Sequence, residues 1–408
     1  MLKKLSSLLI GLFIIGFVFA QDTTQKLVAG RKNDQSQIHK PYVILISADG
    51  FRADFTELYN AEYLKSIATN GVRAKFMTPS FPSLTFPNHY SIVTGMYPSH
   101  HGLVNNTYYD KASGLEYRMG NPKMVGDGKW YGGTPLWVLA EQQKMLSASF
   151  YWVGSEAAIQ NTRPTYYYVY NDKISIANRI KAVKDWLSLP EEQRPHMITF
   201  YMPEVDHEAH TYGPNDPHVE AAVKFVDSSV NALQAELATL NLPINYIFVS
   251  DHGMTKVDND NTLSMPNAID TAAFRVPWGD ALIHLYAKDS SKITATYNAL
   301  KKDTSISVYT LNETPSYWHF KKSDDLYNRL GDLIVVPHLP KVFNFSKRKT
   351  TLGKHGYDNR HPDMRASFMA WGPAFKKGLT IDDFENIHVY PIVAKILGLN
   401  YNENNIDG

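Results

Sequence analysis

The chain has 408 residues, 44% of them hydrophobic and 20% charged, a composition typical of globular proteins that excludes a disordered or low-complexity chain. The 41 Lys and Arg residues nearly balance the 40 Asp and Glu residues, so the net charge of +1 gives no reason to expect binding to nucleic-acid duplexes. The lack of cysteine excludes disulfides, cysteine nucleophiles, zinc fingers and iron–sulfur ligation.

The first part of the chain has the pattern of a targeting segment. Two lysines precede an apolar run over residues 8–20, which is too short for a comfortable membrane span. Ala20 fits the position before a signal-peptidase cleavage site, so we expect residues 1–20 to be a cleavable signal peptide, with an uncleaved anchor as the alternative. Cleavage would leave a nearly neutral exported protein without a stable membrane span, and export without disulfides fits a bacterial periplasm. The polar residues 21–40 are expected to form a linker.

Short apolar strands alternate with helical patterns from Pro41 onward. Near-continuous apolar runs are typical of strands buried on both faces of a parallel sheet, and they occur at residues 42–47, 196–201 and 245–250, with a later strand at 366–371. The expected helices lie at residues 54–69, 134–144, 172–187, 217–240 and 389–397. This alternation predicts an α/β fold with a doubly wound, mostly parallel sheet sandwiched by helices over residues 41–408. The less regular residues 256–350 are expected to be a smaller inserted cap.

Acidic and histidine side chains follow the carboxyl ends of these strands, where ligands collect in such folds. These residues are Asp49, Asp206, His210, Asp251, His252 and, before the late strand, His355. Each alone has an ordinary explanation as a helix N-cap, an ion pair or a turn residue. Burying three carboxylates together is costly without cations, however, and a mixed nitrogen and oxygen ligand set suits Zn²⁺. The sequence therefore favours a metal site.

A proline-rich turn leads into another expected helix. A strand over residues 75–78 enters this turn, and Pro87 fits the first turn of a helix that runs to about Thr94. Thr85 then lies at or beside the helix N-cap, so one interpretation of this residue is a structural cap. The other is a nucleophile, because helix-terminal amides and a nearby metal would stabilise its alkoxide and the attacked anion.

Several motifs occur in one order along residues 41–375. They are ISADGFR at 46–52, TFPNH at 85–89, HGLVNN at 101–106, Asp206-x-x-x-His210 with Gly213-Pro214, SDHGM at 250–254 and HGY at 355–357. Together they closely resemble the nucleotide pyrophosphatase/phosphodiesterase family of the alkaline phosphatase superfamily, in its bacterial type. All of these motifs occur in the order and with the approximate spacing found in that family, so a chance match does not explain them.

The resemblance implies an alkaline-phosphatase-like catalytic domain with two Zn²⁺ ions per chain. The ligands of one zinc would be Asp206, His210 and His355; those of the other would be Asp49, Asp251, His252 and the Thr85 oxygen. Asn106 would donate a hydrogen bond to a non-bridging phosphoryl oxygen. Thr85 would attack phosphorus to give a phosphothreonine diester, and water would release the product. Nucleotide phosphodiester or phosphoanhydride bonds would thus yield nucleoside monophosphates.

The charge of such a site favours diesters over monoesters. Three aspartates contribute −3 and a Thr85 alkoxide −1, and two Zn²⁺ ions contribute +4, so the sum is near zero. A neutral site accepts a phosphodiester monoanion without the extra cation that a monoester dianion would favour.

Aromatic residues near the motifs are candidates for substrate binding. Phe86, Tyr170 and Tyr201 are either core and surface residues or the walls of a base-stacking slot, and the resemblance favours Phe86 and Tyr170 for that role. A nucleotide or other small phosphodiester is the expected partner. The alternatives are glycerophosphodiesters, choline phosphodiesters, phosphonates, or a catalytically inactive metal-binding relative, against which an intact Thr85 and Asn106 argue. No feature of the sequence indicates an oligomeric state.

Overall fold

The structure, a computed structural model that describes residues 23–408, is built around a nine-stranded sheet with the order β1-β8-β7-β9-β2-β10-β17-β3-β18. Strands β8, β7, β9, β2 and β10 are parallel, β17 is antiparallel to β10 and β3, and β1 is antiparallel to β8. The strands are β1 (Lys26–Leu27), β2 (Tyr42–Ala48), β3 (Val72–Ala74), β7 (Ser147–Phe150), β8 (Tyr166–Tyr168), β9 (Met197–Met202), β10 (Ile244–Val249), β17 (Phe368–Trp371) and β18 (Leu379–Ile381). The expected mostly parallel α/β sheet is confirmed.

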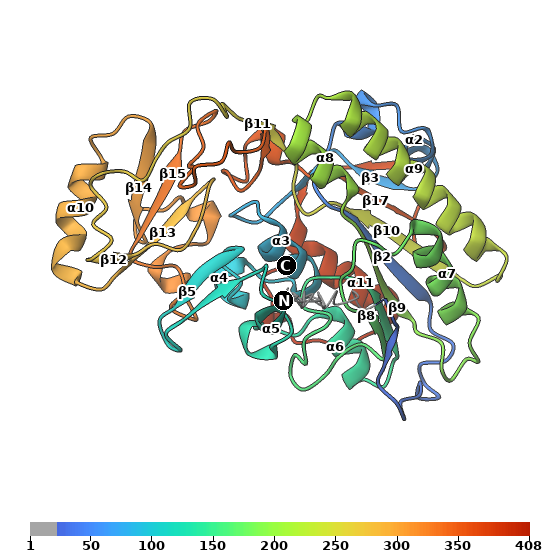
Figure 1. Cartoon of the computed structure of the whole chain (residues 1–408). Helices are drawn as coiled ribbons and strands as arrows, with labels where there is room; N and C mark the ends of the chain where they lie inside the picture. The colour runs from blue at the N-terminus through green and yellow to red at the C-terminus, as the bar shows by residue number, and fades with distance from the viewer. Residues whose placement is uncertain (1–22) are drawn as a thin grey trace, which may run out of the picture.

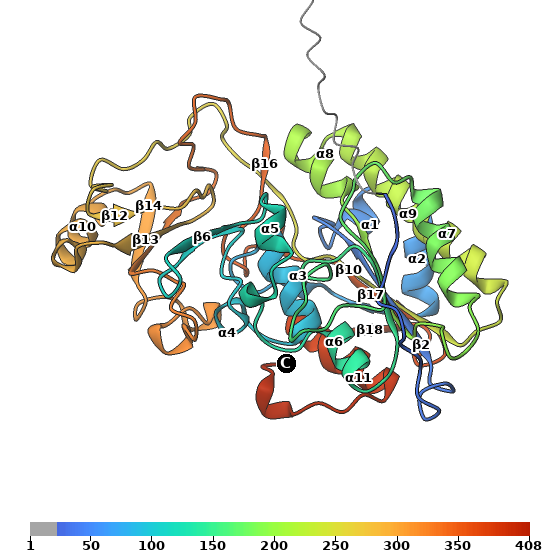
Figure 2. The same ribbon diagram turned by 60° about the horizontal axis from the view of Figure 1, so that its bottom comes forward.

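Helices cover both faces of this sheet, which explains the near-continuous apolar runs. In β2, Val43 and Leu45 belong to one apolar core, whereas Ile44 and Ile46 belong to the other. The first core includes side chains of α3, α6 and α11, and the second includes those of α1, α2, α7, α8 and α9; the two helix layers lie on opposite sides of the sheet (Figures 1 and 2). The bounds are α1 (Phe55–Leu58), α2 (Glu62–Asn70), α3 (Thr85–Thr94), α4 (Pro98–His101), α5 (Pro122–Val125), α6 (Leu136–Gln142), α7 (Ile176–Leu187), α8 (Glu204–Tyr212), α9 (Pro217–Ala238) and α11 (Val389–Leu397).

One expected helix is divided in the structure. The pattern over residues 54–69 becomes α1 and α2, with Asn60 between them at a φ of 51°. This left-handed backbone conformation does not continue a right-handed helix, and Asn is one of the few residues that adopt it readily. The hydrophobic spacing that predicts one helix is preserved because Phe55, Leu64 and Ile67 all reach the same core.

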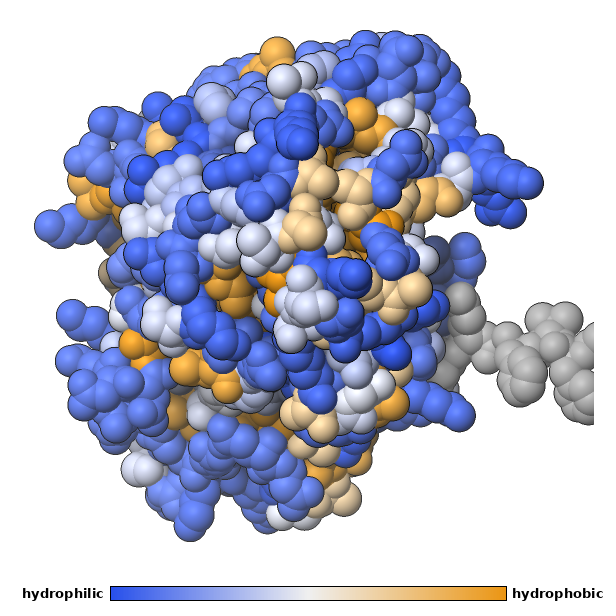
Figure 3. All heavy atoms as spheres, turned by 90° about the vertical axis from the view of Figure 1, so that its left-hand side faces the viewer, coloured by the Kyte–Doolittle hydropathy of each residue, from blue (hydrophilic) through white to orange (hydrophobic). Residues whose placement is uncertain are grey.

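The segment 256–350, called the cap below, carries a separate four-stranded sheet with the order β12-β13-β15-β14, antiparallel throughout. Its elements are β12 (Phe274–Arg275), β13 (Ile283–Ala287), α10 (Ile293–Leu300), β14 (Ile306–Thr310) and β15 (Leu333–Pro337). They share an apolar core of their own and lie on the far side of α3 and α4 from the main sheet (Figure 1). On the outer face of the cap, the described residues are mostly hydrophilic and the apolar ones form small separate groups (Figure 3).

Three short strand pairs complete the description. They are β4 (Met77–Thr78) with β19 (Phe384–Glu385), the hairpin β5 (Thr107–Asp110) with β6 (Leu115–Arg118), and β11 (Thr255–Lys256) with β16 (Gly353–Lys354). The last pair lies where the chain enters the cap and where it returns. It therefore brings the residue after β16, His355, back to the edge of the main sheet.

The described part of the expected linker is packed on the domain. Strand β1 pairs with β8, the Asn33 amide donates hydrogen bonds to the carbonyls of Glu191 and Arg194, and Arg31 lies 3.1 Å from the buried Glu141 carboxylate. These contacts attach residues 23–40 to the domain, although more than half of these residues are exposed to solvent. The expected signal peptide, residues 1–20, lies outside the described residues. Within residues 23–408, no helix combines the length and apolarity that crossing a membrane requires.

Candidate functional site

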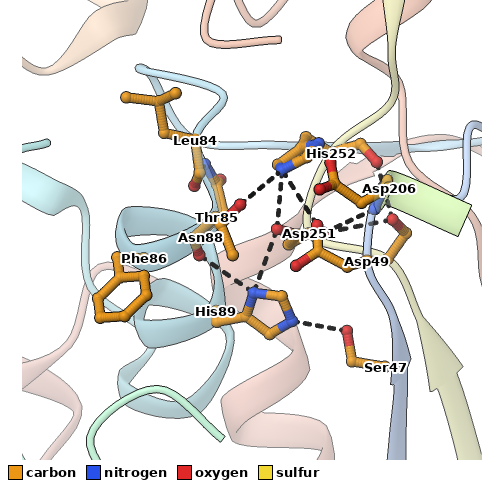
Figure 4. Close-up of polar contacts among 12 residues, drawn as sticks. Ser47, Asp49, Leu84, Thr85, Phe86, Asn88, His89, Asp206, Asp251 and His252 are labelled. Atoms are coloured by element: carbon orange, nitrogen blue, oxygen red, sulfur yellow. Dashed lines mark hydrogen bonds and ion pairs between the residues drawn. The ribbon is translucent and has the colours of Figure 1, made fainter. Parts of the chain in front are cut away.

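The carboxyl ends of three parallel strands bring the expected ligands to one edge of the sheet. Asp49 follows β2, Asp251 follows β10, and Asp206 lies in α8, directly after β9. Because β9, β2 and β10 are neighbours, the three aspartates meet (Figure 4). Gly50 permits this approach: its φ is 67°, and a Cβ there would lie 3.0 Å from the Asp206 Cα.

The six expected Asp and His residues form overlapping groups. The potential ligand atoms of Asp206, His210 and His355 lie within 4.8 Å of one another, and so do those of Asp49, Asp206 and His252. In α8, Asp206 and His210 are one turn apart, with Oδ1 and Nε2 separated by 3.5 Å, as the spacing predicts. Asp251 joins the second group through a distance of 3.0 Å from its Oδ2 to His252 Nε2.

The hydrogen bonds of the three histidines define which ring nitrogen is free. The Nδ1 atoms of His210, His252 and His355 lie 2.8, 2.8 and 2.9 Å from backbone carbonyl oxygens, which only accept hydrogen bonds. Each Nδ1 therefore carries the proton, and each Nε2 presents a lone pair to the site. The Nε2 atoms of His210 and His355 face each other at 3.1 Å. Two lone pairs at this distance repel each other, and a shared cation would remove that repulsion.

The aspartate carboxylates also have lone pairs without a hydrogen-bond donor. Asp49 and Asp251 are buried, and Asp49 Oδ1, Asp206 Oδ1 and Asp251 Oδ2 are buried oxygens that accept no hydrogen bond, although His89 Nδ1 lies 3.1 Å from Asp251 Oδ2. Burial raises the pKa of the Asp49 carboxyl well above its usual value, and the charges of Asp251 and Asp206 raise it further. Buried orphan oxygens beside imidazole lone pairs fit a site built for divalent cations.

Thr85 is the first residue of α3 and is not its cap. The N-cap is Leu84, with φ −115° and ψ 152°, and no side chain caps the helix. The Thr85 hydroxyl oxygen instead lies 3.2 Å from His252 Nε2, and Figure 4 shows it directed toward the carboxylates. This geometry leaves the cap interpretation without support and places a hydroxyl between the helix N-terminus and the ligand cluster.

Asn106 and Thr85 line a pocket of about 340 Å³ between the main domain and the cap. The Asn106 Oδ1 atom accepts a hydrogen bond from the Phe86 backbone N–H at 3.1 Å, so its amide nitrogen remains available to a bound group. The same pocket is lined by Asp206, His210 and His355. The expected nucleophile, phosphoryl-binding amide and one ligand group are thus brought together.

The three candidate aromatic residues lie outside the lining of this pocket. Phe86 extends from the start of α3 away from the carboxylates (Figure 4), and Tyr170 is 51% exposed. The Tyr201 ring lies 6.1 Å from that of Tyr170, while its hydroxyl donates a hydrogen bond to Asp49 Oδ2 at 2.7 Å. Tyr201 is therefore a hydrogen-bond partner of an expected ligand, a contact that the sequence does not indicate.

His89 is a site residue that the sequence reasoning left as structural. Its Nδ1 lies 3.0 Å from the Thr85 carbonyl and 3.1 Å from Asp251 Oδ2, and its Nε2 lies 2.8 Å from the Ser47 hydroxyl. Since Nδ1 must donate to the carbonyl and Nε2 accepts from Ser47, no lone pair is left for a metal. His89 instead positions Asp251 relative to α3. Its place one helical turn after Thr85 is the signal that could have identified it.

We expect His89→Phe to weaken zinc affinity and kcat/KM by about 10- to 100-fold, because Asp251 loses the group that orients it. Zinc affinity is measured by competition with a chromogenic chelator, and kcat/KM with a nitrophenyl nucleotide ester. His196→Phe is the matched control, since His196 is also fully buried and bonded to a carbonyl, that of Pro41, but lies before β9 at the opposite end of the sheet. A larger effect on zinc affinity in the control than in His89→Phe would contradict the assignment.

The comparisons with known proteins agree with this geometry. The model of the family described as Type I phosphodiesterase / nucleotide pyrophosphatase matches residues 43–358. An uncharacterized pyrophosphatase/phosphodiesterase of Schizosaccharomyces pombe is 33% identical over 398 residues, which cover 93% of this chain and 81% of that protein. Ectonucleotide pyrophosphatase/phosphodiesterase family member 1 of Mus musculus is 35% identical over 381 residues, 89% of this chain but only 41% of that protein, so this chain spans less than half of that relative.

Solved structures give the same result. Murine ectonucleotide pyrophosphatase/phosphodiesterase 5 superposes with a TM-score of 0.82 at 27% identity, covering 88% of this chain and 95% of that one. An inactive threonine-to-alanine variant of that murine protein, solved in complex with AMP, has the same TM-score of 0.82 and 27% identity and covers 88% of this chain and 96% of its own. The family resemblance of the motifs is thereby confirmed. The chain belongs to the Type I phosphodiesterase/nucleotide pyrophosphatase family.

Proposed function

We propose that the chain is a zinc-dependent phosphodiesterase and pyrophosphatase that cleaves nucleotide phosphodiester or phosphoanhydride bonds through a covalent intermediate on Thr85. The observation that carries this proposal is the Thr85 hydroxyl, which lies at the start of α3, 3.2 Å from His252 Nε2, and faces a cluster of buried carboxylates. The family membership supports the reaction class, and the murine relative's complex with AMP supports a nucleotide substrate.

The donor groups fit two metal ions. One would be held by Asp206, His210 and His355, and the other by Asp49, Asp251 and His252 with the Thr85 oxygen. Imidazole nitrogens with free lone pairs and carboxylate oxygens without partners are the ligands that Zn²⁺ prefers. Bound zinc would supply the positive charge that stabilises an alkoxide near neutral pH and the charge on the phosphoryl group.

The side chains then have distinct tasks in two displacements. The Thr85 oxygen forms a bond to phosphorus while the bond from phosphorus to the leaving oxygen breaks, and that oxygen takes up a proton. The Asn106 amide, held through its Oδ1 by the Phe86 N–H, donates to a non-bridging oxygen. The N-terminal amides of α3 add partial positive charge. Water then cleaves the Thr85–phosphorus bond, which restores the hydroxyl and releases a nucleoside monophosphate. Phe86 and Tyr170 would stack on the retained base.

The proposal predicts that diesters are strongly preferred to monoesters. Lys354 is the one Lys or Arg among the described residues lining the pocket, and its Nζ is already paired with Asp280 Oδ2 at 2.7 Å. An additional uncompensated negative charge costs several kcal/mol in such a site, so kcat/KM should favour the diester by about 10²-fold or more. The measurement compares the nitrophenyl ester of thymidine monophosphate with nitrophenyl phosphate.

Further substrates separate the alternatives in the same assay. If a nitrophenyl choline phosphate ester, a glycerophosphodiester or a nitrophenyl phosphonate is cleaved faster than the nucleotide ester, that class, and not nucleotides, is the preferred substrate. Equal or reversed preference for the monoester would overturn the charge argument. No hydrolysis of any ester by zinc-loaded protein would indicate an inactive metal-binding relative.

We further propose that the protein is exported to a bacterial periplasm by the signal peptide expected at residues 1–20. The basic start and the apolar run over residues 8–20 support this proposal. Mass spectrometry of the protein from its native host decides it, since cleavage would give an N-terminus at Gln21.

A further inference from the structure

We infer that the pocket between the main domain and the cap is a subsite for the leaving group, in which Trp278 stacks on a second base. The inference rests on the proposed function and adds to it a residue that determines specificity: Trp278 favours dinucleoside monophosphates over nucleoside triphosphates as substrates. Hydrolysis of such a dinucleotide consumes one water, breaks the bond from phosphorus to O3′, gives the proton to O3′, and yields a nucleoside and a nucleoside 5′-monophosphate.

The positions of the two ligand groups identify the pocket as the leaving-group side. In a displacement between two metal sites, one site serves the attacking oxygen and the other the leaving oxygen, in line on opposite sides of phosphorus. The Thr85 oxygen lies by His252, which belongs with Asp49 and Asp251. The pocket is lined by Thr85 and by the other group, Asp206, His210 and His355. A leaving group therefore departs into this pocket.

Trp278 is a cap residue that lines this pocket and has an unusually exposed side chain. It is 55% exposed, whereas the other six tryptophans of the chain are all buried. Met119, 44% exposed, also lines the pocket, and its backbone N–H is bonded to the Asn106 carbonyl. A large apolar side chain that is exposed in the wall of a pocket is available to contact a ligand bound there. An indole ring and a thioether offer surfaces on which a planar base stacks.

The loop that carries Trp278 is held in place. A Cβ on Gly279 would lie 2.0 Å from the Leu282 carbonyl oxygen, so the tight turn after Trp278 requires glycine. The next residue, Asp280, is bonded through its carboxylate to Lys354 Nζ and through its carbonyl to the Phe343 N–H. These contacts join the loop to β16 and to the cap. The indole is thus presented by a fixed backbone, which lowers the entropic cost of binding.

The charge of the pocket favours a nucleoside over pyrophosphate as leaving group. Lys354, the lone Lys or Arg among its described lining residues, is neutralised by Asp280. The remaining polar lining of Asn105, Thr107 and Thr351 offers neutral amide and hydroxyl groups. Such a surface solvates a sugar and a base, but beyond the one metal ion that Asp206, His210 and His355 would hold it offers no unpaired cation to the three to four negative charges of pyrophosphate.

The kinetic test compares adenylyl(3′→5′)adenosine with ATP. We expect the parent to have the higher kcat/KM for the dinucleotide. Trp278→Ala should lower kcat/KM for the dinucleotide by roughly 5-fold or more, mainly through KM, and alter that for ATP much less, because base–aromatic stacking is lost for one substrate only. Trp278→Phe should restore most of the loss. Leu326→Ala is the matched control, since Leu326 is a 64% exposed cap residue that lines another pocket.

A binding measurement gives a readout independent of turnover. In the Thr85→Ala background, titration of zinc-loaded protein with adenylyl(3′→5′)adenosine should quench indole fluorescence, and calorimetry should give a Kd that Trp278→Ala weakens by roughly 5-fold or more. AMP should bind both variants equally. Unchanged dinucleotide affinity in Trp278→Ala overturns the inference while nucleotide hydrolysis by the parent upholds the proposed function. Absence of any nucleotide hydrolysis by the parent overturns both.

Discussion

Thr85→Ala is expected to reduce kcat for nucleotide esters by about 10³-fold or more while leaving the fold and the zinc content intact. The hydroxyl oxygen, 3.2 Å from His252 Nε2, is the one nucleophile at the start of α3, and alanine removes it without removing an Asp or His ligand. Because Leu84 rather than Thr85 is the N-cap, no capping energy of about 1 kcal/mol is at stake, and Tm should change by no more than about 2 °C. Steady-state kinetics, melting curves and zinc analysis on one preparation check all three expectations.

Thr85→Ser is the matched variant, because it keeps the hydroxyl and changes only a methyl group. It should retain a substantial part of the parental kcat, and rapid quenching of either hydroxyl-bearing protein should trap a nucleotidyl adduct detectable by mass spectrometry. A Thr85→Ala protein that is folded, zinc-loaded and nearly as active as the parent would exclude the covalent mechanism. Direct attack by water would then have to replace it.

Removal of metal is expected to have an effect of similar size. Exhaustive treatment with a strong chelator should abolish hydrolysis, and two equivalents of Zn²⁺ should restore it, because the site contains three imidazole lone pairs and three carboxylates. Mg²⁺ should not restore activity, since it prefers oxygen ligands. The apoprotein should also have a lower Tm, because the buried carboxylates of Asp49 and Asp251 and the half-buried carboxylate of Asp206 then lack their compensating charge.

The substitution His355→Ala tests one of the two proposed zinc sites separately. His355 lies directly after β16, the strand that returns from the cap, and belongs only to the group with Asp206 and His210. Its loss should reduce the zinc content from two per chain to one and lower kcat/KM strongly. His361→Ala, in the same returning segment, removes an imidazole whose Nδ1 accepts the Asp363 N–H, and it should keep both zinc ions. Full activity of exhaustively metal-free protein would contradict the metal proposal altogether.

The proposed active site has two parts, one on the main domain and one on the cap, and the part on the cap would affect which substrate is accepted. The proposed catalytic groups lie at the edge of the main sheet, whereas Trp278 and Asp280 lie in the loop between β12 and β13. Substitutions in this loop could therefore alter the leaving group that is accepted without changing the residues proposed to perform the displacement. This division follows the general pattern in which a rigid sheet positions reactive groups and loops determine substrate choice.

The sequence by itself determined the sheet and the residues at its edge. Apolar runs such as residues 42–47 identify strands buried on both faces, and parallel neighbouring strands necessarily end at one edge. Asp49 and Asp251 could thus be placed together from strand positions alone, and Asp206 and His210 from helical spacing. These inferences depend on local periodicity, which is a property of consecutive residues.

Only the tertiary structure decided the contacts between distant segments. These contacts join residues that are far apart in sequence or follow no local pattern. They include the pairing of His89 with Asp251, the hydrogen bond from Tyr201 to Asp49, the packing of residues 23–40 and the position of Trp278 at the pocket. The sequence also left the role of Thr85 open, because a threonine at the start of a helix can either cap that helix or belong to a ligand cluster. The approach of β10 and its following loop to α3 directs the hydroxyl to His252, and that approach depends on how the whole sheet packs.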